Sequence, residues 1–110
     1  MKTIKTARNE MSELENNIIK VAKGWNLYPE TTIQDQLEKL QEEIEEFEEA
    51  HFDLHNAADE QMELGDVYVV LVNIAAKLGY SLERCGHMAY EKIKTRTGKM
   101  INGQFVRDDK

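Results

Sequence analysis

Apolar side chains recur every three or four positions along most of this chain, which is the period of an amphipathic α-helix. The pattern runs over residues 6–23, 32–51, 57–78 and 82–97. Residues that commonly stop or cap helices separate these segments. They are Gly24, Tyr28 and Pro29 after the first segment, Thr31 or Thr32 before the second, His55 and Asn56 after it, Gly79 after the third, and Ser81 before the fourth.

The end of the chain has a different pattern. Asn102-Gly103 lies between two short apolar runs, and this dipeptide favours the tight turn of a β-hairpin. We therefore predict an all-α fold, an antiparallel bundle of about four helices with a short irregular or hairpin tail at the C-terminus. The 110 residues suit a single domain, residues 1–110.

Acidic residues occupy distinct positions around the second and third predicted helices. Glu43 and Glu46 are three residues apart in one helix, and Glu63 and Asp66 are three apart in the next. At about 100° per residue, each pair lies on one flank of its helix's apolar stripe, whereas Glu45 points toward solvent. If the two helices pack antiparallel along their stripes, the flanks meet and four carboxylates converge.

Such a cluster repels itself at low dielectric, so a bound cation or retained protons must neutralise it. The candidate ligands are all oxygen atoms, which favours Mg²⁺, with Mn²⁺ as a substitute, over zinc. The alternative is a glutamate-rich helix whose acids only face solvent. Two acid pairs on the flanks of consecutive helices are much rarer than one acidic run, so we favour a metal site.

Charge is distributed unevenly along the chain. The net charge is −7, which argues against a general nucleic-acid-binding protein. Residues 30–66 hold 14 of the 21 acids and one base, whereas residues 92–110 hold six bases and two acids. An acidic middle can bind a cation, and basic side chains can bind the anion that accompanies it. The candidates for phosphate binding are Lys39, Lys77, Lys92 and Arg96.

Other side chains have two possible roles. Trp25 and Tyr28 can stack on a nucleotide base or pack at a helix end. Asn73 can hydrogen-bond a substrate or face solvent. His51 and His55 are four residues apart, but no cysteine is near them and His51 lies on the apolar stripe, so we expect packed or surface histidines rather than a zinc site.

Composition excludes several classes of protein. The longest apolar run, residues 67–76, is too short to span a bilayer, so we expect no membrane association. The first fifteen residues are polar and lack the apolar core of a secretion signal. The single cysteine, Cys85, cannot form an intrachain disulfide, which fits a reducing cytoplasm.

Two strings in the acidic region resemble a known family. They are Gln36-x-x-Lys39-Leu40-x-Glu42-Glu43-x-x-Glu46 and Glu63-Leu64-Gly65-Asp66 followed by Val72-Asn73-Ile74-Ala75. The chain from about residue 36 to residue 79 is similar to the MazG-like branch of the all-α nucleoside triphosphate pyrophosphohydrolases. The basic tail, Lys92-x-Lys94-x-Arg96 and residues 98–103, also looks like the end of small MazG-like proteins. The phrase around Trp25 departs from the family pattern.

The resemblance implies a four-helix fold and Mg²⁺-dependent hydrolysis of a nucleoside triphosphate, NTP or dNTP, to its monophosphate and pyrophosphate. It implies that Glu43, Glu46, Glu63 and Asp66 bind the metal, and that Glu42 is a further ligand or a base that activates water. Glu42 and Glu46 are therefore the catalytic candidates. It also implies a homodimer or homotetramer. The short core of four helices, with spare apolar residues such as Val69, independently favours at least a dimer.

Three alternatives remain at this point. Two are related enzymes, a dUTPase or a phosphoribosyl-ATP pyrophosphohydrolase, which belong to the same superfamily. The third is a non-catalytic helical module that dimerises or binds a partner. Such a module does not need the four acids on the flanks of its helices, Glu43, Glu46, Glu63 and Asp66.

Overall fold

The computed structural model describes residues 11–108, and most of them are helical. The elements in chain order are α2 (Glu13–Gly24), α3 (Leu27–Glu30), α4 (Ile33–Glu48), the π-helix η1 (Glu49–Leu54), α5 (Ala57–Lys77), α6 (Leu82–Ile93), and the strands β1 (Gly98–Ile101) and β2 (Gln104–Arg107). The predicted all-helical fold with a hairpin tail is confirmed. The first predicted helix began at residue 6, and residues 6–10 lie outside the described part of the chain.

Local sequence explains where the helices begin. The Thr32 hydroxyl accepts a hydrogen bond from the Asp35 backbone N–H, and Asp35 accepts one from the Thr32 N–H, which forms a capping box. Ser81 caps α6 by accepting from the Arg84 N–H. Gly79, with a φ of +84°, ends the turn after α5 in the left-handed conformation that glycine adopts without strain.

Two helix ends differ from the sequence prediction, and one short helix was not predicted. The second predicted helix continues past Glu48 as the π-helix η1, which ends before His55 in the left-handed conformation. The fourth ends at Ile93 and not near residue 97. The short helix α3 was not predicted, because Pro29 favours a break and is tolerated only where, as here, it lies in the first turn.

The C-terminal hairpin has the predicted turn. Met100 pairs with Phe105 and Ile101 with Gln104 across the antiparallel strands. Asn102 and Gly103 both have positive φ, 51° and 79°, as a type I′ turn requires.

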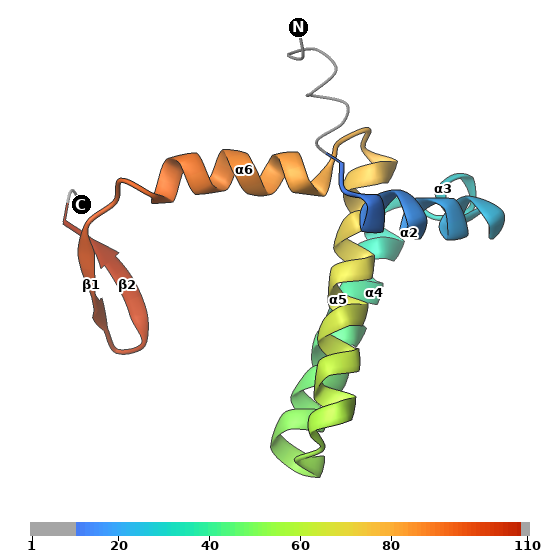
Figure 1. The fold of residues 1–110 in the computed structure, drawn as a ribbon. Coiled ribbons are helices and arrows are strands. Elements are labelled where there is room, and N and C mark those ends of the chain that lie inside the picture. The colour runs from blue at the N-terminus through green and yellow to red at the C-terminus, as the bar shows by residue number, and fades with distance from the viewer. Residues whose placement is uncertain (1–10, 109–110) are drawn as a thin grey trace, which may run out of the picture.

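The helices form an open arrangement (Figure 1). α4 and α5 lie side by side as a long antiparallel pair, and α2 and α3 lie across one end of it. α6 leaves that same end on the opposite side, at a steep angle to α5, and the β-hairpin lies beyond its far end. The chain thus forms an arch whose two legs are the α4–α5 pair and the β-hairpin.

The buried positions correct one expectation. Along α4 and η1 the buried residues are Gln36, Glu43 and Ala50, each seven positions from the next, as in a coiled-coil contact. The apolar stripes that we expected to form the helix contact are partly exposed, with Leu37 45% exposed and Leu64 56%. The helices therefore meet through the flanks that bear the acids, and residues 11–108 leave much of the stripes uncovered. His51, expected on the core side, is exposed as well.

A buried carboxylate fixes the start of α6. Glu15 is 1% exposed, and its Oε1 accepts from the Ser12 N–H at 2.8 Å. Its Oε2 accepts from the Glu83 N–H, in the first turn of α6, at 3.0 Å. One side chain therefore satisfies N–H groups at the beginnings of two helices, where an anion is also favoured by the helix dipole.

No helix in residues 11–108 combines the length and the apolar character needed to cross a membrane.

Candidate metal and phosphate site

Three carboxylates converge where α4 faces α5. Glu43 comes from α4, and Glu63 and Asp66 come from adjacent turns of α5. One carboxylate oxygen from each lies within 4.8 Å of the others. The structure therefore brings together three of the four acids that the sequence predicted as metal ligands. The flanks meet because Glu43 occupies a buried contact position of α4.

The fourth predicted ligand, Glu46, lies beside this cluster. It is exposed, one turn after Glu43, and it is close enough to Glu63 to raise the pKa of that carboxyl group. Glu42, the other predicted catalytic residue, has a largely exposed side chain, and its Oε1 accepts from Lys39 Nζ at 3.1 Å. Glu46 is therefore next to the cluster, whereas Glu42 is held at its edge by a lysine.

Lys39 places a positively charged side chain beside the acid cluster. Its Nζ lies 3.2 Å from Glu43 Oε2 as well as 3.1 Å from Glu42 Oε1. Hydrogen bonds from Lys39 to Glu42 and Glu43 raise the pKa of its ammonium group. One lysine does not neutralise four carboxylates, so the cluster retains an excess of negative charge.

Two oxygen atoms of the cluster are buried without a hydrogen-bond partner among the described residues, Glu43 Oε1 and Glu63 Oε1. A buried acceptor that lacks a partner costs free energy and therefore requires an explanation, such as an ion. These oxygen atoms belong to two members of the cluster, so their position fits a bound divalent cation that prefers oxygen ligands.

Burial and neighbouring acids together raise the pKa of the Glu63 carboxyl group from 4.5 to about 7. Burial is the largest cause, followed by the interaction with Glu46 and by the charges of Asp66 and Glu43. Without a cation, Glu63 therefore holds a proton over much of the range in which the other carboxylates are ionised.

This raised pKa predicts a pH effect on the metal-free protein. Between pH 4.5 and about 7, folded Glu63 keeps a proton that the unfolded chain has released, so its contribution to the free energy of unfolding decreases as pH rises through this window. Glu63→Gln mimics the protonated form. In chelator we expect it to raise the melting temperature at pH 8 and to change it little at pH 4. A constant difference at both pH values would contradict this ionisation.

A cavity of about 410 Å³ adjoins the cluster. Glu43 and Asp66 form part of its wall, and α3, α4, α5 and the residue that follows α2 contribute side chains. Three of the predicted substrate-binding residues also line it, Trp25, Lys39 and Asn73. The indole of Trp25 is 69% exposed, so it does not pack in the core of this chain.

Asn73 is 4% exposed, so of its two possible roles the one in which it faces solvent is wrong. Its Oδ1 accepts a hydrogen bond of 2.7 Å from the hydroxyl of Tyr28. Burial raises the pKa of that hydroxyl, which keeps it protonated as a donor. The sequence indicated Tyr28 as a helix-stop residue or as an aromatic side chain that stacks on a base, and no local pattern reveals its contact across 45 positions.

Gln36 was a second omission from the predicted site. It is 5% exposed, and its amide donates to the Thr31 hydroxyl at 2.9 Å on the wall of the same cavity. Its place in the acidic string, seven residues before Glu43, is the signal that identifies its helix face.

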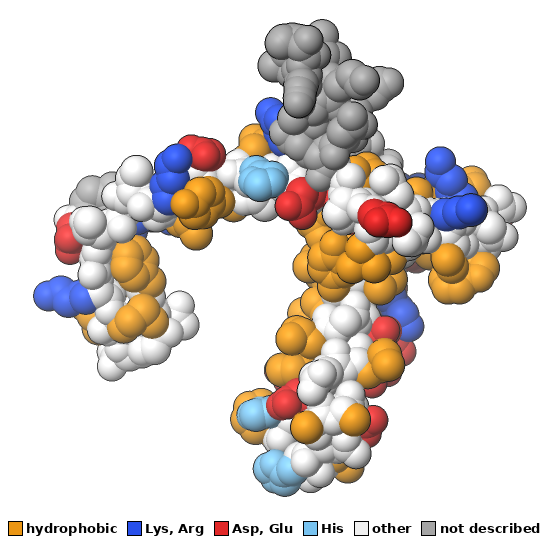
Figure 2. All heavy atoms as spheres, in the orientation of Figure 1, with side chains coloured by type: hydrophobic (Ala, Val, Ile, Leu, Met, Phe, Trp, Pro, Cys, Tyr) orange, Lys and Arg blue, Asp and Glu red, His pale blue; other side chains and the backbone are white. Residues whose placement is uncertain are grey.

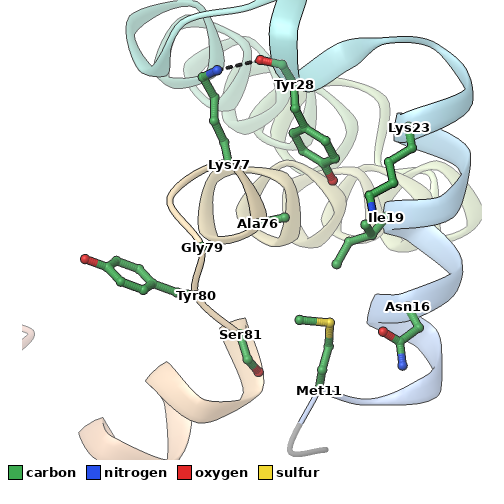
Figure 3. Close-up of a pocket in the computed structure, with 10 residues that line it drawn as sticks. All are labelled: Met11, Asn16, Ile19, Lys23, Tyr28, Ala76, Lys77, Gly79, Tyr80 and Ser81. Carbon is green, nitrogen blue, oxygen red and sulfur yellow. Dashed lines mark hydrogen bonds between the residues drawn. The ribbon is translucent and has the colours of Figure 1, made fainter. Parts of the chain in front are cut away.

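The remaining predicted phosphate-binding residues do not reach this cavity. Lys77 donates to the backbone carbonyl of Tyr28 and lines a separate cavity of about 590 Å³ between α2 and the turn before α6 (Figure 3). Lys92 is in the last turn of α6 and Arg96 follows that helix. Both belong to the arm that leaves the α4–α5 pair on the side opposite α2 and α3 (Figure 1).

The chain was compared with family models, curated proteins and solved structures. None of them matches it. The functional argument therefore depends on the site itself and on the motifs in the sequence.

Proposed function

We propose that this protein is a Mg²⁺-dependent hydrolase that cleaves a nucleoside triphosphate to the monophosphate and pyrophosphate. One observation supports this most directly. Carboxylate oxygens of Glu43, Glu63 and Asp66 lie within 4.8 Å of one another beside a cavity that also contains a lysine and an exposed tryptophan. The similarity of the acidic strings to MazG-like pyrophosphohydrolases points to the same chemistry.

The chemistry of the ligand set fits Mg²⁺. Glu43, Glu63 and Asp66 would hold the ion, with Glu46 beside them, and the unpartnered Oε1 atoms of Glu43 and Glu63 would gain the contact they lack. When bound, Mg²⁺ neutralises phosphate charge and lowers the pKa of water.

Glu46 and Lys39 have separate roles in the reaction. The Glu46 carboxylate, exposed next to Glu63, takes a proton from the attacking water. The water oxygen forms a bond to the α-phosphorus, the bond from that phosphorus to the bridging oxygen breaks, and pyrophosphate leaves with that oxygen. Lys39 lies at the cluster and stabilises negative charge on the phosphates.

Two further residues, Asn73 and Trp25, position the substrate. Because Asn73 Oδ1 is occupied by the Tyr28 hydroxyl, its amide nitrogen is oriented as a donor toward a substrate oxygen. Trp25, on the rim of the same cavity, offers a flat apolar surface for a base.

A screen of all common NTPs and dNTPs for pyrophosphate release tests the proposal. We expect turnover with Mg²⁺ or Mn²⁺, little with Ca²⁺, and none after exhaustive chelation, because the site requires a small ion with tight octahedral geometry. Full activity in chelator, or no turnover of any nucleotide, would contradict it. Strong preference for dUTP, or activity confined to phosphoribosyl-ATP, would instead identify one of the related enzymes.

A metal that binds only the folded state must also raise the melting temperature. This measurement distinguishes the enzyme from a non-catalytic helical module. The module predicts no difference between Mg²⁺ and chelator, because its function would require no bound metal.

A further inference from the structure

We propose that the ammonium group of Lys39 is the counter-ion of the acid cluster when no metal is bound, and that a divalent metal ion displaces it from Glu43. Metal binding thereby decides when this lysine becomes available to an anion in the adjoining cavity. The displacement depends only on the acid cluster, whereas the identity of the anion as a nucleotide phosphate rests on the proposed function.

Lys39 bridges two carboxylates that differ in exposure. Its Nζ lies 3.1 Å from Glu42 Oε1 and 3.2 Å from Glu43 Oε2. The Glu42 side chain is 56% exposed, whereas that of Glu43 is 8% exposed. All three residues belong to α4, at spacings of three and four positions, so the bridge depends on no other element. The ammonium group therefore has one partner in solvent and one in the contact between the helices.

Lys39 is also the one base in a strongly acidic part of the chain. Residues 30–66 contain 14 acids and this single lysine. Figure 2 shows basic and acidic side chains next to each other on the α4–α5 pair, below the place where α2 and α3 cross it. Because the carboxylates outnumber it, the ammonium group is held at the cluster by more negative charge than it can balance.

The two carboxylate oxygens of Glu43 have different surroundings. Oε2 contacts the ammonium group of Lys39, whereas Oε1 is buried and has no hydrogen-bond partner among residues 11–108. Glu63 Oε1 is also buried without a partner in this part of the chain, and both acids belong to the group whose oxygens lie within 4.8 Å of one another. The oxygen atoms that suit a metal ion are therefore not those that Lys39 uses.

A metal ion and the ammonium group nevertheless compete for Glu43. A divalent cation held through Oε1 would share one carboxylate with the ammonium group on Oε2, and like charges so close repel strongly in a partly buried site. The metal ion carries two charges and can bind oxygen atoms of three acids. The ammonium group has two partners, one of them in solvent, so it is the cation that leaves.

Glu42 and the cavity determine where the displaced group goes. The four-carbon stem of Lys39 is flexible, so its Nζ can stay on the exposed Glu42 carboxylate after it leaves Glu43. An ammonium group has three N–H donors, and a bond to Glu42 leaves two of them for another acceptor. Lys39 lines the cavity of about 410 Å³, so an anion in that cavity is within its reach.

The charge of the cavity makes this displacement a switch. The described residues that line it include one base, Lys39, and three acids, Asp35, Glu43 and Asp66. Without metal, the base is bound to two carboxylates, so the cavity repels anions. With metal, positive charge is added and Lys39 is released from Glu43, so the same cavity attracts them. Metal and anion therefore strengthen each other's binding, and this coupling is reciprocal.

Calorimetric titration of Mn²⁺ into the metal-free protein, with no nucleotide present, tests the displacement. Lys39→Met keeps an unbranched side chain but removes the charge, so the metal no longer has to displace a cation. We expect this variant to bind Mn²⁺ at least about fivefold more tightly than the wild type, the lower end of typical couplings between two sites.

Lys20→Met is the matched control, because it removes an exposed base from α2. It should change the affinity for Mn²⁺ by less than about twofold, since solvent and salt screen exposed charges. An affinity of Lys39→Met that is equal to or weaker than that of the wild type would overturn the proposal and leave the metal site in place.

Inorganic phosphate is the probe for the second step. Mn²⁺ should strengthen phosphate binding to the wild type by at least about fivefold relative to chelator, and Lys39→Met should lose most of this gain. An equal gain in both proteins would overturn the release of Lys39 to the anion. If the wild type bound no Mn²⁺, the metal site and the proposal would both be wrong. If both titrations gave the expected results but no nucleotide were turned over, the displacement would stand and the proposed function would be wrong.

Discussion

Glu43→Gln is expected to lower pyrophosphate release by about two orders of magnitude or more, the scale seen when a positioned electrostatic or catalytic group is removed. Glu43 is 6% exposed, and its Oε1 is buried without a hydrogen-bond partner among the described residues. Glutamine keeps the size and polarity of the side chain but removes the charge that a divalent cation requires. Glu46→Gln should have an effect of similar size, because Glu46 adjoins Glu63.

The controls come from the same acidic helix. Glu45 and Glu49 are exposed, so Glu45→Gln and Glu49→Gln should leave activity nearly unchanged. Each variant is assayed for pyrophosphate release at saturating Mg²⁺ and is melted in chelator, where Glu43→Gln should be at least as stable as the wild type because like charge is removed. Equal losses at all four positions would mean that the convergence at Glu43 has no special role, and undiminished activity of Glu43→Gln would remove the case for this site.

The largest effect on stability is expected at Glu15. Glu15→Ala leaves the Ser12 and Glu83 N–H groups without their acceptor, and both hydrogen bonds involve a carboxylate. Since hydrogen bonds to charged groups contribute about 1.5–3 kcal/mol each, we expect the free energy of unfolding to decrease by roughly 3 kcal/mol or more. Urea denaturation at a fixed protein concentration measures this change.

Two comparisons separate this effect from a loss of helix propensity. Glu13→Ala changes an exposed acid in the first turn of the same helix and should alter stability by about 0.5 kcal/mol or less. Glu15→Gln retains one acceptor oxygen and should fall between the two. If Glu15→Ala and Glu13→Ala were equally stable, Glu15 would not hold α6 in place.

Some of this architecture follows from local sequence. Helical periodicity and capping residues located the main helices, with Thr32 and Ser81 at their starts. Asn102-Gly103 gave the hairpin, because only residues that tolerate positive φ form its turn. The spacing of Glu63 and Asp66 also predicted that these two acids share one side of their helix, and the packing of α4 against α5 then brings Glu43 to them.

Other features were decided by the tertiary structure alone. The hydrogen bond between Tyr28 and Asn73 joins residues 45 positions apart, and that between Glu15 and Glu83 joins residues 68 apart. Neither pair has a sequence signature, because such contacts depend on the relative placement of whole helices. The same reason explains why Lys77 and Arg96 were grouped with Lys39 from charge alone, although only Lys39 reaches the acids.

The packing of α4 against α5 shows most clearly what the sequence determined and what only the tertiary structure decided. Sequence periodicity determined which side chains share a face of each helix, because that depends only on 3.6 residues per turn. It did not determine which face meets the neighbouring helix. The structure places the flank with Gln36 and Glu43 there and leaves Leu37 and Leu64 partly exposed. Any apolar surface that covers an apolar stripe removes it from water and stabilises the fold. That surface can belong to another element or to another copy of the chain.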